Sequence, residues 1–314
     1  MDKQLLNAYY NSLQIKATVC LFPGMECTEK PIKAHSIQNS KILDLMQVND
    51  HLIGLKVKPN KFEAPTVSFA LIGRNKASTF EGLCEKHDNE LFHNIDDFIF
   101  NPLDKQQLFL LAYRSVLKET HASMSKAIML QTSYLKKKEI QSISVDTPSR
   151  EGMIAVQSLI DSFETFNYKA ELDIALTNQD YDFLTHRIFK LTTNTPTVVC
   201  SQLFSNDSVR YKDSVSRIIM NIFPIDNQST YAIFSSTLHE KGLADDYLFK
   251  CLNSSSFALN YEISKLIIRN SENFYINPKY FETWTESKKG KILKYFIETL
   301  LQDNDRDDVD YYLF

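Results

Sequence analysis

The chain has 314 residues, of which 43% are hydrophobic, 24% charged and 12% aromatic, with only 7 glycines and 9 prolines. This composition is typical of a globular protein and argues against a collagen-like, repetitive or disordered chain, and the length suffices for two or three domains with their own cores. The net charge of -4 provides no overall basic field, which argues against a protein that coats DNA by charge alone.

The first residues carry no sign of membrane targeting. The segment 1–16 has no continuous apolar run of signal-peptide length, and no later segment approaches the roughly 20 apolar residues that span a bilayer. We therefore expect a cytoplasmic protein without a membrane partner. Cysteines are reduced in that compartment, so clustered cysteines favour metal binding over disulfides.

Residues 1–100 contain short apolar runs bounded by proline, glycine and asparagine, which predict short strands. The clearest of these runs are 19–25, 51–59 and 65–75. After them, the segment 78–96 predicts a helix that begins at Ser78 or Thr79, because Glu81 follows Ser78 at the spacing of a capping box.

The next part of the chain predicts two helices. In 104–141 apolar residues recur at helical intervals, and the basic residues 136–138 suit the negative end of a helix dipole. A break at 145–152 leads into a second helical segment at 153–176. We expect these two helices to form an antiparallel hairpin.

From about Asn178 onward the sequence becomes strand-like. Four apolar segments separated by turn residues predict an antiparallel sheet or a small barrel, and they are 183–191, 195–204, 215–225 and 229–238. Helical signals return at 243–271, 278–287 and 289–301. The last residues, 302–314, form an acidic run with an apolar end, which we expect to be mobile or to face a partner.

The best candidate metal site consists of Cys20, Cys27, Cys84 and His87. Residues 22–24, Phe-Pro-Gly, favour a turn between the first two cysteines, and Cys84 and His87 share one face of a helix. Zinc prefers four tetrahedral ligands of thiolate and imidazole type. We therefore predict a structural zinc site; the alternative is that the cysteines are small buried apolar residues and His87 is a hydrogen-bonded surface histidine.

With its neighbours, this pattern resembles the HNH nuclease family in its zinc-stabilised, treble-clef form. The segment 33–38 is similar to the strand that carries the family's histidine, and 83–91 to the helix that carries a zinc pair followed by a metal ligand. The resemblance implies that His35 is the general base and that Asp88, supported by Asn89, holds a catalytic Mg or Mn ion. Phosphodiester hydrolysis needs such a neutral imidazole and such a divalent cation.

The resemblance covers residues 17–95 and implies a metal-dependent nuclease that hydrolyses phosphodiester bonds in DNA or RNA, in the setting of prokaryotic antiphage defence. The alternative is a noncatalytic zinc-containing adaptor that binds nucleic acid or protein. Either function is compatible with a protein partner or a homo-oligomer. No phosphate-binding loop, dinucleotide-binding motif or serine-hydrolase motif is found.

Together these signals predict an α+β protein. We expect a zinc-bound ββα, treble-clef-like module in 1–100, a helical connector that forms a hairpin in 101–180, and an antiparallel sheet with helices in 181–314 that serves recognition or a partner.

Overall fold

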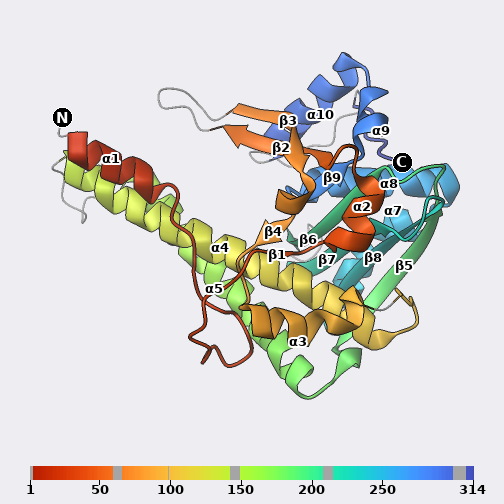
Figure 1. The fold of residues 1–314 in the computed structure, drawn as a ribbon, viewed down its shortest axis with the longest axis horizontal. Coiled ribbons are helices and arrows are strands. Elements are labelled where there is room, and N and C mark those ends of the chain that lie inside the picture. Colours follow the sequence, from red (N-terminus) through yellow and green to blue (C-terminus); the bar gives the residue numbers. More distant parts are fainter. Residues whose placement is uncertain (1–2, 59–65, 98, 142–148, 208–214, 300–308) are drawn as a thin grey trace. The chain divides into compact units, whose positions relative to one another are not determined.

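The computed structural model describes residues 3–58, 66–97, 99–141, 149–207, 215–299 and 309–314 (Figure 1). The chain forms two compact units, each assembled from three separate segments. The first unit contains residues 1–34, 80–93 and 116–181, and the second contains 35–79, 94–115 and 182–314. The described residues form ten α-helices and antiparallel sheets, which confirms a mixed α and β protein.

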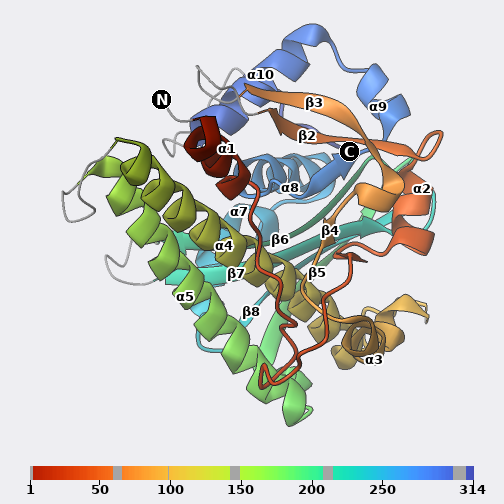
Figure 2. The same ribbon diagram turned by 60° about the vertical axis from the view of Figure 1, so that its left-hand side comes forward.

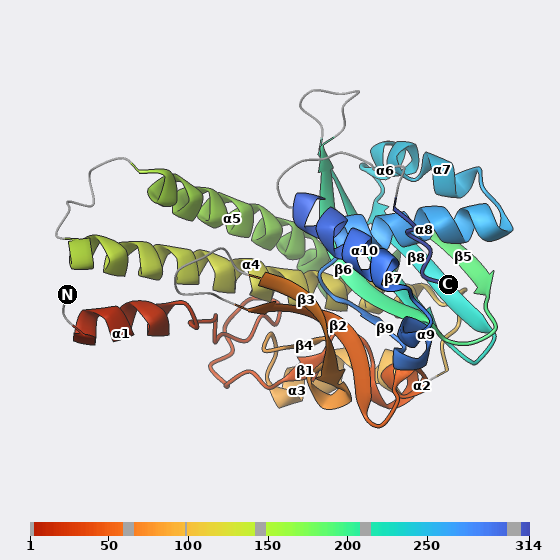
Figure 3. The ribbon, with the colours of Figure 1, turned by 90° about the horizontal axis from the view of Figure 1, so that it is seen from above.

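The first unit is built around two long helices. Helix α4 (Lys105–Gln141) contributes its residues 116–141, and α5 (Arg150–Thr177) lies beside it and runs in the opposite direction (Figure 2, Figure 3). Ser149 caps α5, since its hydroxyl accepts a hydrogen bond from the backbone of Gly152 at 3.1 Å. The two helices and their antiparallel arrangement agree with the prediction from periodicity.

The remaining parts of the first unit are α1 (Lys3–Ser12), an irregular segment at 13–33 and the start of α3 (Glu85–Asp96). The irregular segment is fastened to α4: the backbone N–H of Ala17 donates to Ser125 Oγ at 3.0 Å, and the carbonyl of Ala17 lies 3.1 Å from His121 Nε2. These bonds fix the irregular segment without regular secondary structure.

The second unit contains a seven-stranded sheet in the order β3-β2-β9-β6-β7-β8-β5, in which neighbouring strands are antiparallel. Its strands are β2 (His51–Lys58), β3 (Thr66–Gly73), β5 (Leu184–Thr192), β6 (Val198–Asp207), β7 (Val215–Pro224), β8 (Ser229–Thr237) and β9 (Phe274–Ile276). The four strands predicted in 183–238 are confirmed. Two shorter strands, β1 (Ala34–His35) and β4 (Thr79–Phe80), form a separate two-stranded sheet.

Both faces of the large sheet are covered. On one face the core includes residues of α8 (Ser256–Asn270) and α10 (Glu286–Thr299), and on the other it includes residues of the π-helix η1 (Asn39–Leu43) and α2 (Asp44–Met46). The shorter elements of the unit are η2 (Arg74–Lys76), η3 (Tyr181–Phe183), α6 (Lys241–Tyr247), α7 (Phe249–Leu252) and α9 (Pro278–Glu282). Because the sheet is buried on both faces, the sequences of its strands are continuous apolar runs rather than alternating apolar and polar residues.

Strand β9 joins the N-terminal and C-terminal parts of this sheet. It pairs with β2 through Ile53 and Gly54 and with β6 through Val198 and its neighbours. Gly54 is required there, because a Cβ atom would lie 3.0 Å from the ring of Tyr275. The strands in 51–73 thus share a sheet with those in 184–237, while the predicted division at residues 100 and 180 stays a prediction.

Three local predictions are corrected by the structure. The predicted strand at 19–25 is wrong, because these residues lie in the irregular segment and form the turn in which the N–H of Met25 donates to the carbonyl of Phe22. Ser78 does not begin a helix: its backbone is left-handed, with φ of 55°, and its hydroxyl accepts a hydrogen bond from the backbone of Ile37 at 3.1 Å. Helix α3 begins at Glu85 instead. The strand β4 occupies Thr79 and Phe80, because its pairing with β1 outweighs the capping signal.

The end of the acidic tail is also different from the expectation. Of 302–314, the structure describes 309–314, and there Val309, Tyr311 and Leu313 are buried in the core of the second unit. The backbone N–H of Leu313 donates to Ser264 Oγ at 3.0 Å. Alternate residues face inward, so residues 309–314 pack into the core of the second unit.

Candidate metal centre

Backbone hydrogen bonds place the two cysteines of the irregular segment beside α3. The N–H of Leu21 donates to the carbonyl of Gly82 at 2.7 Å, and the N–H of Ile32 donates to that of Leu83 at 2.8 Å. These bonds hold the segment that contains Cys20 and Cys27 alongside the residues just before Cys84.

The turn between Cys20 and Cys27 forms as the sequence predicts. The N–H of Met25 donates to the carbonyl of Phe22 at 3.0 Å, and Gly24 takes a left-handed conformation with φ of 84°. Such a φ is readily adopted by glycine, because it has no Cβ. The turn returns the chain toward its start and brings both sulfur atoms to the same place.

Cys84 and His87 lie at the start of α3. The carbonyl of Cys84 accepts a hydrogen bond from the N–H of Asp88 at 2.9 Å, so the first helical turn begins at Cys84. Residues three apart on a helix face the same side. The side chains of Cys84 and His87 therefore point together toward the other two cysteines.

The four predicted ligands meet at one point. The ligand atoms of Cys20, Cys27, Cys84 and His87 all lie within 4.8 Å of one another. His87 Nδ1 is 3.4 Å from Cys20 Sγ and 3.3 Å from Cys84 Sγ, and the sulfur atoms of Cys27 and Cys84 are 3.8 Å apart.

Three of the six separations, the two sulfur–nitrogen distances and the Cys27–Cys84 distance, match the edges of a metal-centred tetrahedron. With metal–sulfur bonds of about 2.3 Å and a metal–nitrogen bond of about 2.0 Å, sulfur–sulfur edges measure about 3.8 Å and sulfur–nitrogen edges about 3.5 Å. All five cysteines of the chain are free thiols in the structure. The four residues could therefore bind a metal ion, in a donor set of three sulfur atoms and one nitrogen.

The surroundings shift the pKa values of two of the thiols in opposite directions. Burial raises the pKa of Cys20 to about 11. Burial also raises the pKa of Cys84, but hydrogen bonds from the backbone of His87 and from the thiols of Cys27 and Cys20 outweigh it and bring the pKa below its ordinary value. Because metals bind thiolates, metal binding would release protons from these groups.

Two residues near the cluster were not anticipated from the sequence. The ring of Phe22 stacks on His87, with centroids 3.8 Å apart and planes 11° from parallel. Lys169 of α5 is fully buried and paired with Asp173, and burial lowers its pKa while the charges of Asp173 and Cys20 raise it. A buried ammonium group offsets part of the negative charge of three thiolates.

His35 belongs to the second unit and is not one of the four clustered ligands. Burial is the main cause that lowers its pKa, and the backbone of Arg74 is its hydrogen-bond partner. Its Nε2 atom is buried and has no hydrogen-bond partner among the described residues. Asp88 and Asn89 follow His87 on α3, where Asp88 is half-buried and Asn89 exposed.

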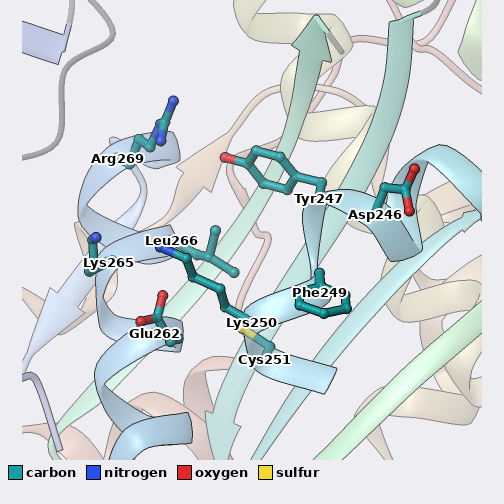
Figure 4. Close-up of a pocket in the computed structure, with 9 residues that line it drawn as sticks. All are labelled: Asp246, Tyr247, Phe249, Lys250, Cys251, Glu262, Lys265, Leu266 and Arg269. Atoms are coloured by element: carbon teal, nitrogen blue, oxygen red, sulfur yellow. The ribbon is translucent and has the colours of Figure 1, made fainter. Parts of the chain in front are cut away.

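The second unit also contains cavities away from these residues. One of 270 Å³ lies between α6, α7 and α8, where basic and acidic side chains both line the wall, among them Lys250, Lys265 and Glu262 (Figure 4). Burial raises the pKa of Cys251 in this wall to about 12, so its thiol is unreactive at neutral pH.

Comparisons with protein-family models, curated proteins and solved structures found no match to the chain. Among the described residues, no helix has the length and apolar character needed to cross a membrane.

Proposed function

We propose that Cys20, Cys27, Cys84 and His87 hold a structural zinc ion. The observation that supports this is the match between three of their separations and the edges of a tetrahedron with three sulfur atoms and one nitrogen. Four protein ligands close the coordination sphere, as in structural zinc sites. The ion would fasten the irregular segment to α3.

Metal analysis of the purified protein tests this site. We expect one equivalent of zinc in the wild type and less than half an equivalent in Cys27→Ser. Cys200→Ala, a cysteine of the large sheet, is the matched control and should keep its zinc. A wild-type protein that is folded and zinc-free, without exposure to a chelator, would rule the site out.

We also propose that the chain is a metal-dependent, HNH-like nuclease with His35 as its general base. The supporting observation is the state of the His35 ring. The hydrogen bond between the His35 ring and the backbone of Arg74 raises the pKa of His35, which is the effect of a ring N–H that donates to a carbonyl. The Nε2 atom has no partner among the described residues. The bond therefore uses Nδ1, and Nε2 keeps its lone pair.

A neutral imidazole with a bare Nε2 is the form that can remove a proton from water. Because the pKa of His35 is lowered, this form persists at neutral pH. Asp88, with Asn89, offers oxygen ligands of the type that Mg and Mn prefer. Such an ion would supply positive charge to the phosphate during hydrolysis of DNA or RNA.

Cleavage assays test the nuclease. Plasmid DNA and RNA are incubated with Mg or Mn and with wild type, His35→Ala or Asp88→Ala. We expect both variants to lose activity by about 100-fold or more, since a general base alone contributes that much. His51→Ala is the control, because His51 is an exposed histidine whose Nδ1 lies 2.6 Å from the carbonyl oxygen of Asn49.

The result is read together with the zinc content of each variant. His35→Ala should keep its zinc, so lost cleavage cannot be assigned to a lost metal module. Equal cleavage by all the proteins would eliminate His35 and Asp88 as catalytic residues. The setting in antiphage defence is a part of this proposal that rests on the family resemblance alone.

The second candidate function is a noncatalytic zinc-containing adaptor for nucleic acid or protein. It is favoured by the burial of His35 Nε2, which separates this atom from solvent water. The adaptor requires a full equivalent of zinc and no cleavage with any divalent cation, so the same assays distinguish the two functions.

A further inference from the structure

Helix α5 exposes a row of large apolar side chains. Met153, Val156, Ile160, Phe163 and Ile174 are between 45% and 72% exposed. On a monomeric protein, single exposed apolar residues are common, but a continuous row along one helix marks an interaction surface. We call this row, together with Asn167 and Ala170, the α5 seam.

The opposite face of α5 is already used within its own unit. Four of the seven buried residues of α5 are small, and the seven are Ala155, Ser158, Ser162, Tyr168, Lys169, Leu172 and Ala175. Because that side packs within the first unit, the α5 seam is a second apolar surface, on the side of the helix that its own unit leaves exposed.

The residues of the seam alternate at intervals of three and four, which is the heptad spacing of a coiled coil. The a positions are Met153, Ile160, Asn167 and Ile174, and the d positions are Val156, Phe163 and Ala170. The 22 residues from first to last span about 33 Å at 1.5 Å per residue. This spacing fits a second helix better than a flat surface or a small ligand.

Asn167 indicates which helix packs against the α5 seam. It is the only polar residue at the seven seam positions, and it is exposed. A single asparagine at an a position specifies register and a two-stranded state, because in a parallel pair it meets the same asparagine of the partner helix. Against an apolar partner its amide would be buried without a hydrogen bond.

The flanking charges favour the same arrangement. In a parallel pair each e position faces a g position five residues earlier on the partner, so Glu164 faces Leu159 and Glu171 faces Phe166. No like charges meet. In an antiparallel pair the e positions face one another, and two of the three, Glu164 and Glu171, are acidic.

The area is sufficient for a stable pair. Five exposed apolar side chains of α5 belong to the seam, and a sixth, Leu159, lies beside it at a g position. At about 100 Å² each these six give about 600 Å² per copy and about 1,200 Å² for two copies, at the lower end of the range of specific interfaces.

We propose that the chain forms a parallel homodimer through the α5 seam, with Asn167 of one copy hydrogen-bonded to Asn167 of the other. The proposal is independent of zinc and of nuclease activity. It assigns the seam to one partner, a second copy of the same chain.

Sedimentation equilibrium of the full-length protein tests the surface. Wild type should be a dimer at micromolar concentration, and Phe163→Glu should weaken the dimer by at least 100-fold. Ile154→Glu is the matched control: it makes the same change from an exposed apolar residue to glutamate on the same helix, at a b position that points away from the seam, and should leave the dimer unchanged. Circular dichroism confirms that each variant is folded.

A monomeric wild type, or a Phe163→Glu protein that is as dimeric as wild type, would overturn the proposal. A wild-type protein that is monomeric but binds another protein or a lipid vesicle through the seam would also overturn the proposal.

Cross-linking tests the orientation. In a parallel pair the two residues at position 167 face each other within reach of a disulfide, whose Cα atoms lie roughly 4.4 to 6.8 Å apart. Asn167→Cys should therefore form a covalent dimer on mild oxidation, whereas Asp161→Cys, outside the seam, should not. Equal cross-linking of both variants, or of neither, would contradict the parallel arrangement.

Discussion

Replacing Tyr311 by alanine should destabilise the core of the second unit strongly. The Tyr311 side chain is 1% exposed, and its ring lies 4.8 Å from that of Tyr295 and 6.0 Å from that of Tyr261, measured between centroids. Lys265 Nζ lies 5.4 Å from the same ring. Removing the ring leaves a cavity lined by these side chains.

The size of the effect follows from the burial. Truncation of a fully buried aromatic residue to alanine costs about 4 kcal/mol. With a urea dependence of about 3 kcal/mol per molar for a unit of this size, the midpoint of unfolding should fall by about 1.3 M. The loss of about 4 kcal/mol is a large part of the usual free energy of unfolding of a domain, which is about 5 to 15 kcal/mol.

The chain contains its own probe for this measurement. Trp284 is the only tryptophan, and it is 5% exposed in the same core as Tyr311. Its fluorescence in urea therefore reports the unfolding of the second unit. Asp310→Ala is the control: its side chain is 61% exposed and pairs with Lys288, and such surface pairs contribute about 0 to 1 kcal/mol. A midpoint for Tyr311→Ala within about 0.3 M of this control would refute the packing of 309–314.

Three further perturbations test other parts of the second unit. Asp96→Ala should lower the free energy of unfolding by about 3 kcal/mol in urea, because it removes the carboxylate that pairs with the buried guanidinium of Arg114. Adding Arg114→Leu should recover part of the loss, and a double variant less stable than Asp96→Ala would contradict this. Burial lowers the pKa of His186 to about 4 from 6.5, so the fold is most stable above pH 6.5, where His186 is neutral in both states. As the pH falls from 6.5 to 4, the free energy of unfolding should decrease by up to about 3 kcal/mol. His186→Leu should flatten the dependence of stability on pH in this range, and an unchanged slope would count against this. Gly54→Ala should cost about 1 to 3 kcal/mol by pressing on Tyr275, and an unchanged melting temperature would show that the strands yield without cost.

Periodicity predicted the long elements well. Helices α4 and α5 and strands β5 to β8 extend over enough residues for apolar positions to repeat several times. Both faces of the sheet are buried: Val198 packs into the core on one face, and its neighbour Val199 packs into the core on the other. Continuous apolar runs therefore identified these strands in the sequence. Chemistry predicted the four clustered ligands, because few other roles bring cysteine and histidine to this spacing.

Elements fixed by distant contacts could not be predicted. The backbone N–H of Ser78 donates to Tyr275 Oη at 2.6 Å, across 197 residues, and this contact helps hold Ser78 outside any helix. Strand β9 has three residues, too few for a repeating pattern. Lys169 is a buried lysine on a helix, and its only local signal is Asp173 four residues later.

The position of β9 in the large sheet affects how the chain folds during its synthesis. At a synthesis rate of about 5 to 20 residues per second, Tyr275 follows Gly54 by roughly 10 to 40 s. During that interval the hairpin of β2 and β3 exists with the β2 edge that β9 will occupy still unpaired. An unpaired edge readily recruits other strands. Until β9 is made, the β2 edge can therefore pair with the wrong strand, and completing β9 removes that risk.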